Sequence, residues 1–139
     1  MTEGPQLVRS FVAVGAGFFA IQMLGWGADA AFRASAPQSF DVHGRALNAS
    51  TLLTMLAYAA ALEVVGGYVT ARLAIRRTTL HAVILGLVVF AMTLPVTVLT
   101  WRTTPTWYAV WSLALIWPMT ILGATIHEML SKRGADGGQ

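Results

Sequence analysis

Apolar residues in this chain of 139 residues run in four long stretches that lack charge almost completely. Fourteen of the fifteen Asp, Glu, Lys and Arg residues fall between these stretches or at their ends, and Glu63 is the single exception. A helix needs roughly 17–25 apolar residues to cross the hydrocarbon core of a bilayer, and each stretch is of that length. The stretches cover residues 10–28, 46–71, 78–101 and 103–126.

This pattern predicts an all-α protein with one membrane domain over residues 1–130, built as an up-down-up-down bundle of four transmembrane helices. A polar, glycine-rich tail from 131 to 139 is expected to be disordered. The predicted helices span about 8–28, 47–72, 79–101 and 106–128.

Composition supports a membrane protein and excludes several classes of function. Hydrophobic residues make up 56% of the chain and charged residues 11%, far from the roughly 25% charged residues of an average soluble domain. The net charge is +3, but the basic residues cap apolar helices and form no stripe with exposed aromatic residues, so we expect no nucleic-acid partner. Cysteine is absent, which excludes disulfides, thiol catalysis and thiolate metal sites.

The distribution of Lys and Arg predicts the orientation. Cytoplasmic segments of membrane proteins carry an excess of these residues. Six lie on the side of both chain ends and three on the other side, so we predict cytoplasmic termini in a multi-pass protein of the cell (inner) membrane. The connection 29–45 and a belt of tryptophans then face outward.

Small residues indicate which helices pack together. Ala59, Glu63 and Gly67 recur every four residues in the second stretch, beside Gly66, and Ala13 and Gly17 share a face of the first. Small residues let transmembrane helices approach closely, so we expect the first, second and fourth helices to pack through such faces. Two prolines inside predicted helices should each free a backbone carbonyl and bend the helix: Pro95 that of Ala91, and Pro118 that of Ala114.

Glu63 is the strongest candidate for chemistry, because a central acidic residue in a spanning helix is costly and is usually paired, protonated or in contact with water. Gln22 lies at a similar predicted depth and within reach of it. Two roles stay open for this pair: a polar lock between helices, or a proton or cation site.

His81 and His127 are weaker candidates near the cytoplasmic surface. They could relay protons toward Glu63 or bind a metal with Glu128, but His127-Glu128 lacks the second histidine of the metalloprotease helix motif. Interfacial hydrogen bonding is the favoured role for both. The outer residues Asp29, Asp41 and His43 are interpreted as part of a solvated loop rather than a cation site. We therefore predict no metal and no cofactor.

The run Gly66-Gly67-Tyr68-Val69-Thr70-Ala71-Arg72, followed by Arg76-Arg77, His81 and Gly86, resembles uncharacterised small four-helix bacterial integral membrane proteins. Such proteins also show a Pro-x-Trp-Tyr start to the last helix, here Pro105 to Tyr108, and a later Pro and Gly, here Pro118 and Gly123. The resemblance covers the second half to two thirds of the chain. It implies a fold and a membrane location, and no activity.

No nucleophile, phosphate-binding or dinucleotide motif is present in the sequence, so we do not predict an enzyme. The first hypothesis is a structural or accessory helix-packing component of the membrane. The alternative is an oligomeric small-solute or proton-coupled transporter that uses Glu63. The expected partners are the lipid bilayer and either further copies of the chain or a larger membrane complex.

Overall fold

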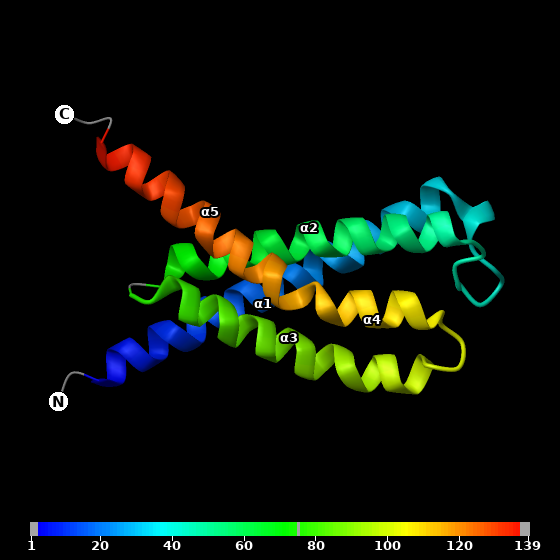
Figure 1. Cartoon of the computed structure of the whole chain (residues 1–139), viewed down its shortest axis with the longest axis horizontal. Coiled ribbons are helices and arrows are strands. Elements are labelled where there is room, and N and C mark those ends of the chain that lie inside the picture. Colours follow the sequence, from blue (N-terminus) through cyan, green and yellow to red (C-terminus); the bar gives the residue numbers. More distant parts are fainter. Residues whose placement is uncertain (1–2, 75, 137–139) are drawn as a thin grey trace.

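The computed structural model describes residues 3–74 and 76–136, and over these residues it is an all-α bundle (Figure 1). Four spans are long and apolar enough to cross a membrane, which confirms the predicted fold class and makes the chain a multi-pass membrane protein. The fourth span consists of two helices. The elements in order are α1 (Glu3–Ser35), the 3-10 turn η1 (Pro37–Ser39), α2 (Ala49–Leu73), α3 (Thr78–Thr100), α4 (Thr106–Ala114) and α5 (Ile116–Asp136).

Successive spans run in opposite directions, as predicted. Figure 1 shows the beginning of α1, the α2–α3 turn and the last part of α5 at one end of the bundle, which we call the terminal end. The α1–α2 connection and the α3–α4 turn lie at the opposite end, which we call the loop end. The beginning of α1 and the end of α5 therefore lie on the same side of the four spans.

Helix α2 is the element on which the other helices pack, because its most extensive contacts are with α5 and α1. Its adjacent glycines face different neighbours. A Cβ atom at Gly66 would collide with the Ile21 side chain of α1, and one at Gly67 would collide with the Thr120 backbone of α5. The glycine pair thus lets two helices approach α2 at the same level. Packing of the first, second and fourth spans through small residues is as predicted.

The core lies in the middle of the bundle and toward the terminal end. Ile21, Leu85, Val89 and Ile116 form a buried cluster contributed by α1, α3 and α5. Closer to the terminal end, Ala71, Ala82 and Ala124 form a second buried cluster between α2, α3 and α5. At the loop end, the side chains of the described residues surround a cavity instead of forming a third buried cluster.

Helix α1 is longer than predicted at both ends. Pro5 lies in the first turn, where its missing N–H leaves no intrahelical bond unmade, so the helix begins at Glu3. At the other end Ala28, Ala30 and Ala31 are strong helix formers, and the helix continues to Ser35. Asp29 and Arg33, which we had assigned to the outer connection, are therefore helical.

The fourth span differs from the single predicted helix. Helix α4 ends at Ala114 and α5 begins at Ile116, which is where Pro118 removes the hydrogen bond to the Ala114 carbonyl. Helix α3 contains Pro95 without an interruption. Helix α5 continues to Asp136, so residues 131–136 of the tail expected to be disordered are helical, and residues 137–139 lie outside the described residues.

Candidate functional site

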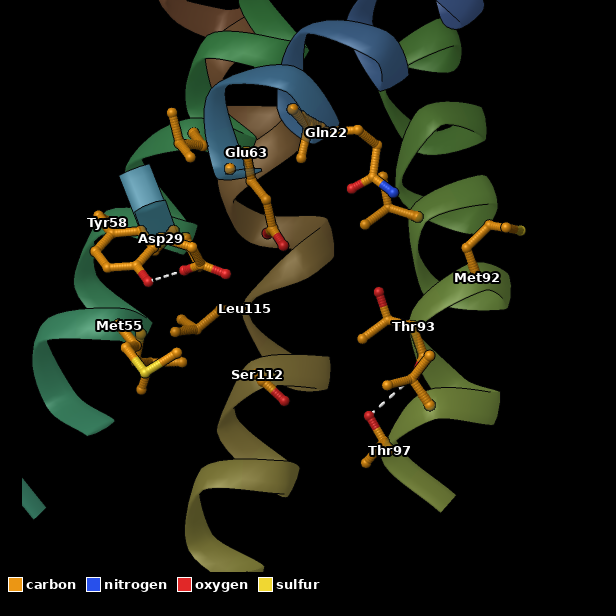
Figure 2. Close-up of a pocket in the computed structure, with 18 of the residues that line it drawn as sticks. Gln22, Asp29, Met55, Tyr58, Glu63, Met92, Thr93, Thr97, Ser112 and Leu115 are labelled. Carbon is orange, nitrogen blue, oxygen red and sulfur yellow. Dashed lines mark hydrogen bonds between the residues drawn. The ribbon is translucent and has the colours of Figure 1, made fainter. Parts of the chain in front are cut away.

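A cavity of about 550 Å³ lies between α1 and α2 on one side and α3 and α4 on the other. It extends from mid-bundle, where Ile21, Glu63 and Val89 line it, to Thr100 and Thr104 at the loop end. Figure 2 shows side chains from all four helices pointing into the same space. Its size is within the roughly 300–1,000 Å³ of pockets that hold small molecules.

Glu63 lies at the inner end of this cavity. The side chain is only 8% exposed, and its Oε2 atom is buried with no hydrogen-bond partner among the described residues. The carboxyl group points into the cavity (Figure 2). A buried charge is normally paired or hydrogen-bonded, so an unsatisfied carboxyl oxygen at a cavity wall is an unused binding group.

Gln22 lines the same cavity from α1 (Figure 2). This position agrees with the prediction that Gln22 lies at a similar depth to Glu63. However, within residues 3–74 and 76–136 no hydrogen bond joins Gln22 to Glu63, so the pair does not form the polar lock that we considered. Both side chains present polar atoms to the cavity instead. The sequence predicted the placement of these residues but not their lack of a partner.

The second carboxylate of the cavity, Asp29, was missed as a site residue. It points inward from α1 and accepts a hydrogen bond from the Tyr58 hydroxyl of α2 (Figure 2). The seven-residue spacing of Gln22 and Asp29 predicts that they share one helix face. The predicted helix ends at Ala28, however, which assigns Asp29 to the outer connection and not to the interior.

Hydroxyl groups on α3 and α4 line the opposite wall and were also missed. Thr97 Oγ1 donates to the Thr93 carbonyl at 3.0 Å, Thr100 Oγ1 to the Val96 carbonyl at 2.8 Å, and Ser112 Oγ to the Ala109 carbonyl at 2.9 Å. Each hydroxyl donates its hydrogen bond to a backbone carbonyl of its own helix. Its oxygen lone pairs remain free to accept a hydrogen bond from another group.

The electrostatics of the cavity are one-sided. Asp29 and Glu63 are its two charged residues, and no Lys or Arg lines it in the part of the chain that the structure describes. Arg33, one turn beyond Asp29, is used elsewhere: its Nη1 donates to the Gly44 carbonyl at 2.5 Å, and its guanidinium lies 4.7 Å from the Phe40 ring centroid. The cavity therefore contains two acidic side chains and, among the described residues, no basic one.

His81 and His127 do not line the cavity, so the structure does not bring them to Glu63. His81 Nε2 contacts Ser10 Oγ at 2.9 Å, and its Nδ1 lies 3.0 Å from the Arg77 carbonyl oxygen. His127 packs edge-to-face on Tyr68. The His81–Ser10 contact joins α3 to α1, and the His127–Tyr68 packing joins α5 to α2. His127 Nδ1 is buried without a hydrogen-bond partner among the described residues, so this atom does not make the interfacial hydrogen bond expected of His127.

Glu128 accepts hydrogen bonds from the hydroxyls of Thr78 and Thr79, and therefore acts as a tie between α3 and α5. Among the described residues, no group of three or more His, Cys, Asp or Glu side chains is arranged to hold a metal ion. No third ligand of these types therefore joins His127 and Glu128, the pair of residues that the sequence offered as possible metal ligands.

Asp41 closes a turn in the outer connection. Its Oδ1 accepts from the backbone N–H groups of His43 and Arg45, at 2.8 Å each. The Arg45 N–H has the larger effect and the His43 N–H adds to it, so both hold the pKa of Asp41 below its ordinary value. Asp41 and His43 serve this turn, whereas Asp29 faces the cavity.

Comparison with known proteins gives no match, whether with protein-family models, with curated proteins or with solved structures. The proposed function therefore depends on the cavity and its side chains.

Proposed function

We propose that this protein is a small-solute carrier of the cell (inner) membrane, with Glu63 and Gln22 in its binding site. The observation that carries the proposal is the unsatisfied, buried carboxyl oxygen of Glu63, which faces a cavity of about 550 Å³. Intramembrane carboxylates that face an internal cavity mark solute or ion pathways, because their burial is too costly without a role.

The break in the fourth span supports the same proposal. Leu115, the residue between α4 and α5, lines the cavity, and the next residue, Ile116, belongs to the buried cluster that closes the bundle beneath Glu63. Solute sites in transporters typically lie beside discontinuous helices near the bilayer midplane. We propose that bending at Leu115 moves Ile116 and opens the route to the terminal end.

The positive-inside rule adds a direction. The loop end carries fewer basic residues than the terminal end, and we propose that it faces outward, away from the cytoplasm. Solute would enter the cavity between the α1–α2 connection and the α3–α4 turn. It would leave toward the cytoplasm, past Ile21, Val89 and Ile116.

The accessory role considered first has less support. It rests on small-residue faces and a lone buried carboxyl group, which are sufficient for helix association. Gly66, Gly67, Gly86 and Gly123 lie against other helices of the same chain, whereas a Cβ atom at Gly15 or Gly27 would have no neighbour within 4 Å.

Single-cysteine labelling tests the carrier, and the natural absence of cysteine makes the protein a ready background. Ser112→Cys places a thiol on the cavity wall, while Val110→Cys places one on the exposed side of the same helix, two residues away. In proteoliposomes, a membrane-impermeant maleimide should label the first variant. The second should stay unlabelled, because a thiol in lipid does not form the reactive thiolate.

A carrier must also expose its site to the second side. We expect Ser112→Cys to react from the loop end and, more slowly, from the terminal end. Equal resistance of both variants from both sides would overturn the proposal, since no water would then reach the cavity. Labelling from the loop end alone would contradict transport and leave a one-sided binding site.

A further inference from the structure

We infer that the cavity selects a small organic cation that carries N–H donors, such as a protonated amine or guanidinium on an apolar body. This inference rests on the proposed carrier function and names the solute class of the same site. Three independent properties of the lining point to it: its charge, its hydrogen-bonding polarity and its size.

Charge comes first. The cavity contains two acidic side chains and, within the described residues, no basic side chain, so an anionic solute would find no cationic partner in it. The Asp29 carboxyl group accepts a hydrogen bond from the Tyr58 hydroxyl, whereas Glu63 Oε2 has no partner among the described residues. Glu63 is therefore the acidic group left to pair with a cationic solute.

Hydrogen-bonding polarity narrows the class. The hydroxyls of Thr97, Thr100 and Ser112 donate to backbone carbonyls and can only accept from a solute. The Glu63 carboxyl group adds further acceptors, and Figure 2 shows Thr97 on α3 and Ser112 on α4 bordering the same space. These acceptors are complementary to the N–H groups of an ammonium or guanidinium group.

Size and apolar lining exclude a bare metal ion as the best fit. A dehydrated ion occupies a small part of about 550 Å³, and the structure gathers no three-ligand set of His, Asp or Glu among its described residues. Phe18, Met55, Leu56 and Met92 supply apolar surface around the polar groups. Methionine and aromatic side chains suit the apolar body and the charged head of an organic cation.

Matched ligands test the inference by isothermal titration calorimetry on the whole protein in lipid nanodiscs at pH 7. The probes share a phenylethyl or similar body and differ in charge: 2-phenylethylamine (cationic), 2-phenylethanol (neutral) and phenylacetate (anionic). We expect measurable binding of the amine and at least tenfold weaker binding of the other two. A quaternary analogue, trimethyl(2-phenylethyl)ammonium, should bind several-fold more weakly than the amine because it has no N–H donors.

Variants localise the binding. Glu63→Gln should weaken amine binding by roughly tenfold or more, because the amide keeps the shape and loses the charge. Thr97→Val, nearly isosteric, should weaken it several-fold by removing one acceptor. Glu128→Gln is the matched control at the terminal end, outside the cavity, and should bind the amine as the wild type does. Tryptophan fluorescence and a thermal unfolding curve establish that each variant is folded.

Two results would overturn the inference. One is binding of phenylacetate or 2-phenylethanol as tightly as the amine; the other is equal amine affinity of folded Glu63→Gln and wild-type protein. Either result would leave the proposed carrier function standing, provided that Ser112→Cys is labelled from both sides of the membrane. Conversely, amine binding without two-sided labelling would support the solute class and contradict transport.

Discussion

The Tyr58 hydroxyl of α2 donates a hydrogen bond to the Asp29 carboxylate of α1 inside the cavity. This bond joins the two helices at the loop end, beside the edge-to-face contact of the Tyr58 ring with Phe32 of α1. The two acidic residues therefore differ. Asp29 has a hydrogen-bond partner within the protein, whereas Glu63 Oε2 has none among the described residues and is available to a solute.

Removal of the hydroxyl should loosen the loop end. Hydrogen bonds to charged groups stabilise folded proteins by about 1.5–3 kcal/mol. We expect Tyr58→Phe to lower the free energy of unfolding by about that amount, since the phenylalanine leaves a carboxylate without its donor. Equilibrium unfolding in mixed micelles measures the change. Asp29→Asn is the control, because its amide oxygen still accepts from Tyr58, and it should cost less; an equal or larger loss would mean that the hydrogen bond is not the source.

The glycine contacts predict a graded series. Gly67→Ala would press a methyl group into the Thr120 backbone, Gly66→Ala would collide mainly with Cδ1 and Cγ1 of the Ile21 side chain, and at Gly15 nothing lies within 4 Å. Overpacking costs about 1–3 kcal/mol, whereas Ala in an open helical position gains up to about 1 kcal/mol over Gly. Unfolding free energies should therefore fall in the order Gly15→Ala, Gly66→Ala, Gly67→Ala. Equal stability of the Gly67 and Gly15 variants would refute the proposed seating of α5 on α2.

Glu63 should be dispensable for folding. Replacing a buried charge that lacks a partner with an apolar side chain of similar volume is often neutral or stabilising. We expect Glu63→Met to unfold with a free energy equal to or above that of the wild type, measured as for the Tyr58 variant. A loss of about 2 kcal/mol or more would instead identify the residue as a polar lock between helices, the role that the sequence left open.

The outer turn should depend on pH through Asp41. Its pKa is lowered from the ordinary 3.8 by the N–H groups of Arg45 and His43, so the carboxylate is favoured in the folded turn. The stabilisation is present above pH 3.8 and is lost as the pH falls through the lowered pKa. Hydrogen exchange should show protected His43 and Arg45 amides at neutral pH and unprotected ones at strongly acidic pH.

Two variants identify the group responsible. In Asp41→Ala those amides should be unprotected at every pH. Asp41→Asn retains an acceptor oxygen and should keep the protection without the pH dependence. A wild-type turn that stays protected well below the ordinary pKa of Asp41, with the carboxyl group protonated, would contradict this assignment.

The fold could be predicted from the sequence because its cause is local. Charges confined to the ends of four apolar stretches require four spans, and the adjacent Gly66 and Gly67 indicate a helix approached on two sides. Pro118 marked the break at Ala114 correctly. The predicted end of α1 at Ala28 is wrong, because the charged residues Asp29 and Arg33 do not end a helix in alanine-rich sequence, and α1 continues to Ser35.

The site was predictable only in part. Glu63 and Gln22 were found because polar residues inside apolar stretches are conspicuous, but no pattern in the sequence says whether two such groups bond to each other. The contribution of Tyr58, Thr97 and Ser112 depends on how α2, α3 and α4 turn toward a common space. Threonine and serine are common in helices of this kind, so their role became visible only from the relative rotation of the helices.

One measurement combines the cavity, the solute class and Glu63: the rate at which Ser112→Cys reacts with an impermeant maleimide, with and without saturating 2-phenylethylamine. The amine should slow the reaction when residue 63 is Glu and slow it much less, at the same concentration, in the Glu63→Gln background, because the amide holds the cation more weakly. An unchanged rate in both backgrounds, with the thiol accessible, would contradict the account.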